Sequence, residues 1–389
     1  MHPSSAVMWR RTAAYAFTVL TSLLLLAGPA HADTIRSQQW YLDAMRAEEI
    51  WKVTTGAGIT VAVIDSGVDS RLPDLQGQVL PGKDFSGIEE PTPPDYYGHG
   101  TRMALFIAGT GSSNSGQGSY GLAPGAKILP LRVAGDHAPR TSLLPGTTMA
   151  NAIRFAAESP AQIVNISMGA PGLDPEEAKA VEHALSKGKL IFASVGNNGA
   201  KGNEVLYPAG FPGVVGVAAV GQDVKAIARS ERGPQVDLAA PGDNMVASCL
   251  GGTGVCRGSG TSDATALASA SAALVWSAHP DWTANQVLRV LINTAGGPKS
   301  GEKRSDSIGY GVVRPRVALQ NPGDPGPPDV SPLPELAAAK SAAPKAGPAD
   351  EPEGDGLLSK RNAIAAGVCI VVAAVAATTV LVVRRRRAL

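Results

Sequence analysis

Residues 59–69 read Ile-Thr-Val-Ala-Val-Ile-Asp-Ser-Gly-Val-Asp, an apolar run that ends in a carboxylate at Asp65. Four further apolar runs of strand length follow along the chain, at 127–133, 163–168, 190–195 and 214–220. Because these runs are apolar on both faces, each predicts a strand that is covered from both sides. The opening stretch therefore predicts the first strand of a buried, parallel sheet.

Helical stretches lie between the predicted strands. Residues 174–177 (Asp-Pro-Glu-Glu) have the cap, the proline and the acidic residues of a helix start, and that helix is expected to end near Gly188. Residues 283–286 predict a second start through a capping box, with Gly296 as the stop. Strands that alternate with helices predict an α/β fold in which a parallel sheet carries helices on both faces. Sites in such sheets lie at the carboxyl ends of the strands.

Three polar residues lie where such a site is expected. Asp65 ends the first strand, His99 lies in Tyr-Gly-His-Gly-Thr before an apolar helix, and Ser262 follows Gly-Ser-Gly-Thr at the start of a helix of small residues. Taken singly, each has a structural alternative, because aspartate and serine cap helices and a histidine in a glycine-rich turn is more often structural. Together they are the carboxylate, the base and the nucleophile that acyl transfer requires.

The three motifs resemble those of the subtilisin-like serine proteases, in the same order along the chain. The resemblance covers about residues 40–320. Residues 194–199 (Ser-Val-Gly-Asn-Asn-Gly) resemble the family stretch that carries the oxyanion-hole asparagine, which implies that role for Asn197. The resemblance also implies a substrate-binding site that includes Ser167, Met168, Gly169, Ser194 and Leu206.

The implied chemistry is acyl transfer without a metal or other cofactor. Ser262 attacks the peptide carbonyl, His99 acts as base and then as acid, and Asp65 orients His99. The Ser262 backbone N–H and the Asn197 side chain hold the oxyanion, and losing one such donor costs about 3–4 kcal/mol of transition-state stabilisation. The rival interpretation is a catalytically impaired subtilisin fold that serves as a structural component. A nucleotide-binding fold is disfavoured, because no G-x-G-x-x-G follows a predicted strand.

Three positions depart from the family pattern. Asp263 follows the predicted nucleophile, where a neutral residue is usual, Ala266 replaces a proline, and Arg102 stands where another histidine is common. A carboxylate at Asp263 would oppose an oxyanion about 6 Å away by about 3 kcal/mol at an effective dielectric of 20. Neighbouring helical residues point about 100° apart, and a carboxylate favours the first turn of a helix. We therefore expect Asp263→Asn to keep activity.

The floor of the primary specificity pocket is a glycine in the resembling family, directly before Tyr-Pro-Ala. Here Leu206 occupies that place. Its extra carbons predict a pocket for small side chains and a bias of about tenfold or more against large ones. The alternative is that the loop before Leu206 shifts the alignment with the family by one residue. Val205 or a backbone group would then form the floor of the pocket.

Both ends of the chain have the pattern of targeting segments. Residues 1–32 predict a signal peptide, because Arg10 and Arg11 precede an apolar run and Ala-His-Ala at 30–32 fits a cleavage site. An uncleaved anchor is the alternative. Residues 363–383 carry no charge over 21 positions, enough to cross about 30 Å of bilayer core, and Arg384–Arg387 follow. They predict a transmembrane helix rather than a buried core helix, because no polar stripe interrupts the run.

The remaining chain predicts one body and one linker. Residues 33–320 are expected to form a single peptidase domain, and residues 321–362, which hold nine prolines, a semi-rigid tether. Residues 384–389 would form a basic cytoplasmic tail. This order predicts a single-pass cell-membrane protein with its catalytic domain outside the cytoplasm.

The order of these segments resembles the mycosins, membrane-anchored proteases associated with type VII secretion systems. Residues 39–42 (Gln-Trp-Tyr-Leu) are similar to their mature N-terminus. The resemblance implies a serine endopeptidase with protein or peptide substrates, and partners among the membrane components of a secretion system.

Charge and cysteine content narrow the function further. A formal net charge of +1, from 34 basic and 33 acidic residues, argues against a nucleic-acid partner. Three cysteines are too few for a four-cysteine zinc site. Cys249 and Cys256 flank a glycine-rich loop in the predicted exported body and predict a disulfide worth about 2.5 kcal/mol. Cys369 lies in the predicted membrane helix.

Overall fold

The computed structural model describes residues 34–88, 94–133, 145–252 and 254–336 of the 389-residue chain. The chain divides into two units, Met1–Ala339 and Lys340–Leu389, and all described residues belong to the first. The predicted signal peptide, transmembrane helix and basic tail lie outside the described residues. Within the described ranges, no helix combines the length and the apolar character that a bilayer crossing needs.

Seven parallel strands form the central sheet, in the order β2-β3-β1-β4-β6-β8-β9. The five predicted strands are confirmed to within two residues at each end. The outer strands β2 and β9 were not predicted, because β2 consists of two exposed charged residues and β9 is a short run of mostly small residues that ends in proline. The bounds are β1 Thr60–Asp65, β2 Lys83–Asp84, β3 Lys127–Arg132, β4 Ile163–Ile166, β6 Leu190–Ser194, β8 Val215–Val220 and β9 Leu238–Pro241.

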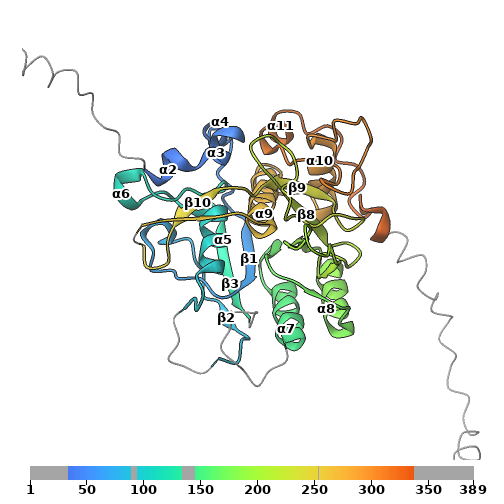
Figure 1. Ribbon diagram of the computed structural model, residues 1–389, viewed down its shortest axis with the longest axis horizontal. Helices are drawn as coiled ribbons and strands as arrows, with labels where there is room; N and C mark the ends of the chain where they lie inside the picture. The colour runs from blue at the N-terminus through green and yellow to red at the C-terminus, as the bar shows by residue number, and fades with distance from the viewer. Residues whose placement is uncertain (1–33, 89–93, 134–144, 253, 337–389) are drawn as a thin grey trace, which may run out of the picture. The chain divides into compact units, whose positions relative to one another are not determined.

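Helices cover both faces of this sheet, as predicted (Figure 1). The helices α7 (Pro145–Glu158) and α8 (Pro175–Ser186) pack on one face, where Ala62 and Ile64 of β1 point. The helices α5 (His99–Ala108), α9 (Thr261–Ala278) and α10 (Ala284–Thr294) pack on the other face with Val61 and Val63. Successive residues of β1 thus enter two separate apolar cores, which explains why the strand is apolar throughout.

The predicted helix starts are confirmed by their capping contacts. The Asp174 side chain accepts a hydrogen bond from the backbone N–H of Glu176 at 2.8 Å. At α10, the side-chain oxygen of Gln286 accepts from the backbone N–H of Thr283 at 3.1 Å. Both helices end two residues before the glycine predicted as the stop.

Short elements connect the main ones. They are α2 Ile35–Gln38, α3 Trp40–Ala44, α4 Ala47–Trp51, the 3-10 helix η1 Pro73–Leu75, α6 Ser113–Gly116, α11 Pro315–Gln320, the ribbon of β5 Ala170–Pro171 with β7 Leu206–Tyr207, and the hairpin of β10 Met245–Ser248 with β11 Val255–Gly258. The N-terminal segment is anchored in the interior. The fully buried Gln39 donates to the carbonyl of Tyr120 at 2.9 Å, and the buried Tyr41 hydroxyl donates to that of Val246 at 3.3 Å.

The chain continues along the body past residue 320, where the domain was expected to end. Leu333 is only 1% exposed and belongs to the apolar core. Arg289 of α10 donates to the carbonyls of Pro325, Pro327 and Val330. Side chains of the body thus hold the carbonyl groups of the proline-rich segment, so residues 321–336 are part of the folded unit rather than of a tether.

Candidate active site

The end of β1 and the start of α5 bring Asp65 and His99 into contact. The Nδ1 atom of His99 lies 2.8 Å from Oδ1 and 3.0 Å from Oδ2 of Asp65. The Asp65 side chain is 1% exposed, and its Oδ1 also accepts from the backbone N–H of Ser66 at 2.8 Å. Burial of His99 lowers its pKa, but the charge and the hydrogen bond of Asp65 outweigh this effect, so the pKa is raised above its ordinary value. A carboxylate in this position can orient an imidazole.

Ser262 is the second residue of α9 and is tied to the end of β4. Its hydroxyl donates to the carbonyl of Ser167 at 2.9 Å, while the Ser167 hydroxyl donates to the carbonyl of Ser262 at 3.1 Å. The side chain of Asn165 donates in turn to the Ser167 hydroxyl at 3.0 Å. Among the described residues, no hydrogen bond joins Ser262 to His99. The Ser262 hydroxyl is thus engaged with the end of β4 in this structure.

Asn197 follows β6 and lies beside the start of α9. Its side-chain oxygen accepts from the backbone N–H of Thr261 at 3.0 Å. This contact fixes which end of the amide faces the helix, so the Nδ2 group is the end that remains to donate. Ser194, the last residue of β6, is buried just before this loop.

Three of the predicted substrate-binding residues lie in or next to the ribbon of β5 and β7: Met168, Gly169 and Leu206. A Cβ atom added at Gly169 would lie 3.4 Å from the Cβ of Leu206, while Met168 is half-buried. A Cβ at Gly210 would instead lie 2.7 Å from the side chain of Val205. Val205 also lines a separate cavity of about 240 Å³. Of the two candidates for the pocket floor, Leu206 is the one that lies against the strand end 167–169.

The two charged departures from the family pattern contact each other. Arg102 Nη2 donates to Asp263 Oδ1 at 2.9 Å, and the Asp263 side chain is fully buried. Burial raises the pKa of the Asp263 carboxyl, and the charge of Arg102 opposes that rise. Asp263 therefore has a specific partner that was not predicted, besides its place in the first turn of a helix. Ala266, the third departure, is buried within α9.

Residues 56–311 match the model of the subtilase family, peptidase S8. The match covers well over half of the chain and includes every candidate site residue named above. The chain belongs to the subtilase family.

Relatives of this subtilase include proteases from several bacteria. Fervidolysin of Fervidobacterium pennivorans is 30% identical over 319 residues, which cover 75% of this chain but only 45% of fervidolysin. Thermitase of Thermoactinomyces vulgaris is 32% identical over 259 residues, which cover 67% of this chain and 88% of thermitase. The crystal structure of MycP1 from the ESX-1 type VII secretion system is similar with a TM-score of 0.68 and 28% identity, over 77% of this chain and 90% of that one. The resemblance to the mycosins is thereby confirmed.

The predicted disulfide is present in the subtilase body. Cys249 and Cys256 are bonded, with their Cα atoms 5.0 Å apart, across the tip of the β10–β11 hairpin. The hairpin reaches the residue before His99, because a Cβ added at Gly98 would lie 3.3 Å from Leu250. Gly98 directly precedes His99 and has a positive φ of 85°, a conformation that favours glycine. The hairpin loop and the residue before His99 therefore pack closely.

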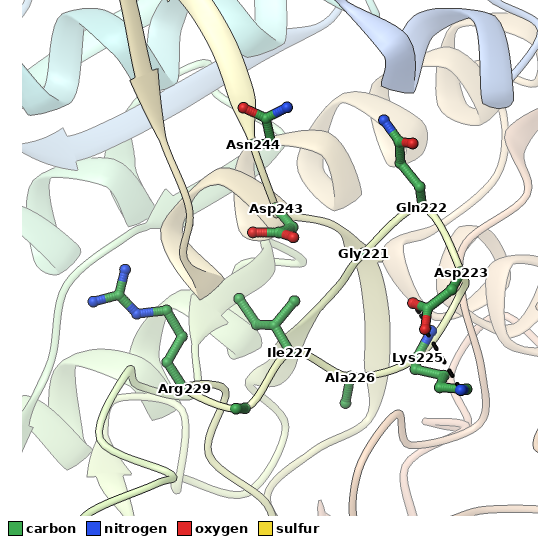
Figure 2. Close-up of a pocket in the computed structure, with 10 residues that line it drawn as sticks. Gly221, Gln222, Asp223, Lys225, Ala226, Ile227, Arg229, Asp243 and Asn244 are labelled. Atoms are coloured by element: carbon green, nitrogen blue, oxygen red, sulfur yellow. Dashed lines mark hydrogen bonds and ion pairs between the residues drawn. The ribbon is translucent and has the colours of Figure 1, made fainter.

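An open pocket of about 920 Å³ lies beside the segment that leads into Ser262. Figure 2 shows Asp243 and Asn244 on one side of it and the segment from Gly221 to Arg229 on the other. Arg229 donates to the carbonyl of Ser259 at 2.7 Å, and the Ser259 hydroxyl donates to Asp243 at 2.7 Å. The pocket wall and the approach to α9 are thus held by the same contacts.

Asp95 holds the loop before His99 and was missed by the sequence analysis. Its fully buried carboxylate accepts five hydrogen bonds: from the Ser66 hydroxyl, from the backbone N–H groups of Tyr97, Gly98 and Thr101, and from the Thr101 hydroxyl. The Ser66 hydroxyl in turn accepts from the backbone N–H of Gly100 at 3.0 Å. The start of α5 is therefore fixed to the residue that follows Asp65. An aspartate four residues before a glycine-flanked histidine is the only sequence signal for this role.

We predict that Asp95→Ala lowers the free energy of unfolding by about 3–5 kcal/mol, because it leaves several buried donors without an acceptor. Urea unfolding measures this change. Asp223→Ala is the matched control, since Asp223 is exposed and Lys225 is its only ion-pair partner in the described part of the chain. It should change stability by less than about 0.5 kcal/mol. Equal stability of the two variants would show that Asp95 does not hold the loop.

Proposed function

We propose that this subtilase is a serine endopeptidase that hydrolyses peptide bonds in proteins or peptides. The observation that carries the proposal is the buried contact of Asp65 with His99 at 2.8 Å, made between the strand and the helix that pack beside the start of α9. Ser262 lies at that start and has a hydroxyl that can turn. Protease is also the activity that the names of several relatives state.

In the proposed mechanism, the Ser262 hydroxyl leaves the carbonyl of Ser167 and gives its proton to Nε2 of His99 while Oγ bonds to the substrate carbonyl carbon. Asn197 Nδ2 and the Ser262 backbone N–H stabilise the oxyanion. The imidazolium, stabilised by Asp65, then protonates the amine as the C–N bond breaks. A water molecule then gives a proton to His99 while its oxygen bonds to the acyl carbon. The C–Oγ bond breaks, His99 returns the proton to Oγ of Ser262, and the carboxylic acid leaves.

One observation favours a second candidate function. The Ser262 hydroxyl is hydrogen-bonded to Ser167 rather than to His99, as expected for a subtilisin fold that serves a structural role in a secretion complex. Apo active sites often form their catalytic hydrogen bonds only with substrate, so the endopeptidase remains the better-supported function. Reaction with a serine-directed fluorophosphonate separates the two.

We predict that the full-length chain is labelled by a fluorophosphonate at Ser262 and hydrolyses peptides. Ser262→Ala should remain folded and lose about a million-fold in kcat, because it removes the nucleophile. Ser271→Ala is the matched control, since it removes a buried hydroxyl from the same helix, one that donates to the carbonyl of Leu267 within that helix. Peptide hydrolysis and circular dichroism test both variants. A folded wild-type protein that is not labelled would contradict the enzymatic function.

We further propose that the protein works at the membrane of a type VII secretion system. The similarity to MycP1 supports this setting, as does the uncharged segment 363–383 with its following arginines. In this proposal the signal peptide exports the body, the helix anchors it, and the membrane components of the secretion system are its partners.

Membrane anchoring predicts a clear fractionation result. The full-length chain should sediment with membranes and resist extraction by high salt, whereas a chain that ends after residue 336 should be soluble. Immunoblotting of the fractions measures this difference. Full-length protein in the soluble fraction would contradict the anchor without affecting the proposed activity.

Small side chains are the proposed preference at the residue before the cleaved bond. The support is the position of Leu206 against Gly169, where its side chain takes up room that a glycine would leave open.

We predict that peptides with Ala or Ser before the cleaved bond are preferred about tenfold or more over peptides with Phe. Leu206→Gly should widen the preference toward large side chains. Val205→Ala should leave it unchanged, because Val205 lies against Gly210 instead. A peptide library measures all three proteins. Preferential cleavage after Phe or Tyr by the wild type would contradict this assignment of the floor.

A further inference from the structure

Two charged side chains meet between the helix of the proposed base and the helix of the proposed nucleophile. Arg102 lies three residues after His99 in α5, and Asp263 directly follows Ser262 in α9. Their side chains are joined by a hydrogen bond of 2.9 Å between residues 161 positions apart in the chain. Because α5 and α9 pack in the same apolar core, this contact links the backbones that carry His99 and Ser262.

The pair is enclosed on several sides. The Asp263 side chain is fully buried and that of Arg102 is 22% exposed. A Cβ added at Gly258 would lie 2.2 Å from Arg102 Nη1, so the guanidinium rests against the backbone at the end of β11. Any side chain at Gly258 would displace Arg102. The close contact between the guanidinium and the Gly258 backbone favours the planar group of arginine over the ammonium group of lysine. Arg102 is therefore held between α9 and the disulfide hairpin.

The pair also acts on the proposed base through its charge. The charged groups that face His99 are Asp65 from β1, Arg102 from its own helix and Asp263 from α9; the ring of Tyr97 stacks against it with centroids 6.5 Å apart. Asp65 and Asp263 favour the protonated imidazole, and Arg102 disfavours it.

Further charged or titratable groups act on Asp263. The charges of His99 and Arg229 favour its ionised form, as that of Arg102 does, and Tyr41 lies close enough to interact with it electrostatically. Arg102 is its only hydrogen-bond partner among the described residues. Loss of Arg102 would therefore remove the one direct contact of this carboxylate.

We propose that Arg102 and Asp263 are a pair of positioning residues, which hold the helix of the base against the helix of the nucleophile and cancel each other's charge at His99. The proposal rests on the proposed function only in the roles that it gives His99 and Ser262. It explains why two departures from the family pattern occur together: either charge alone would be uncompensated in a buried place beside His99. It revises the expectation that Asp263→Asn is neutral.

The first test follows His99 by NMR in the purified full-length chain, with histidine labelled and the His99 signal assigned from a His99→Gln variant. Asp263→Asn should lower the pKa of His99 by about one unit, because the Arg102 charge then acts alone. The double variant Arg102→Gln, Asp263→Asn should restore the wild-type value. Arg154→Gln is the matched control, since it breaks an exposed arginine–carboxylate pair with Glu176 between α7 and α8. An unchanged value in Asp263→Asn, or no recovery in the double variant, would overturn the proposal.

The second test measures the rate of fluorophosphonate labelling at Ser262. Each single variant should react about tenfold or more slowly than the wild type, and the double variant should be less impaired than the product of the two single effects. Effects that multiply, or rates within twofold for all variants, would overturn the positioning role. If the wild type is not labelled, the proposed function fails, while the NMR titration still decides whether the charges cancel.

If Asp263→Asn does not fold, thermal unfolding is used to compare the folding of this single variant with that of the double variant. Folding of the double variant where the single variant fails would show the coupling directly. If neither folds, Arg102→Met with Asp263→Leu fills the same space without charge. A His99 pKa in that protein more than about half a unit from the wild-type value would overturn the cancellation, and a value within that range would support it.

Discussion

The position of the whole candidate site depends on the burial of α9 in the centre of the molecule. Sixteen of its eighteen residues are buried, and only the last two, Ser277 and Ala278, are partly exposed. A helix can lie this deep because its side chains are mostly alanine and serine, which allow close approach of the strands. Its interior serines form hydrogen bonds within the core, as Ser269 does with Asn165 of β4 at 3.0 Å. Packing on both α5 and the sheet then leaves the helix start, with Ser262, little freedom to move.

Buried carboxylates hold the loops around this helix in the same way. Asp95 accepts five hydrogen bonds around the start of α5. Asp74 accepts from Ser113 and Ser119, which lie six residues apart in one loop, and from Ser248, which is distant in the chain. A buried carboxylate is stable only when such donors surround it. The hydrogen bonds to each carboxylate therefore favour one conformation of the surrounding loops. The loop before His99 is held in this way by Asp95.

Strands and helix starts that depend on a local sequence pattern could be predicted, whereas contacts between residues far apart in the chain could not. The strand that ends at Asp65 and the helix capped by Asp174 follow from apolar periodicity and capping chemistry, and both are observed. The Arg102–Asp263 contact could not be predicted, because the local sequence around each residue carries no information about a partner 161 positions away. The packing of Leu333 was missed for a related reason: a proline-rich composition indicates an extended chain, but not whether the body offers donors such as Arg289 to its carbonyls.

The disulfide hairpin of β10 and β11 contacts the segments that precede both helix starts. The bond between Cys249 and Cys256 closes the tip of β10 and β11, while the other end of β11 supplies Gly258, against which Arg102 packs. Two residues later Gly260 leads directly into the helix of Ser262. Arg102 thus lies between the base of the disulfide-closed hairpin and Asp263 of α9. Since Leu250 at the tip also packs against Gly98, the same hairpin touches both the residue before His99 and the segment before Ser262. The relative position of the two helix starts is therefore set from two sides, by the sheet beneath them and by the hairpin beside them.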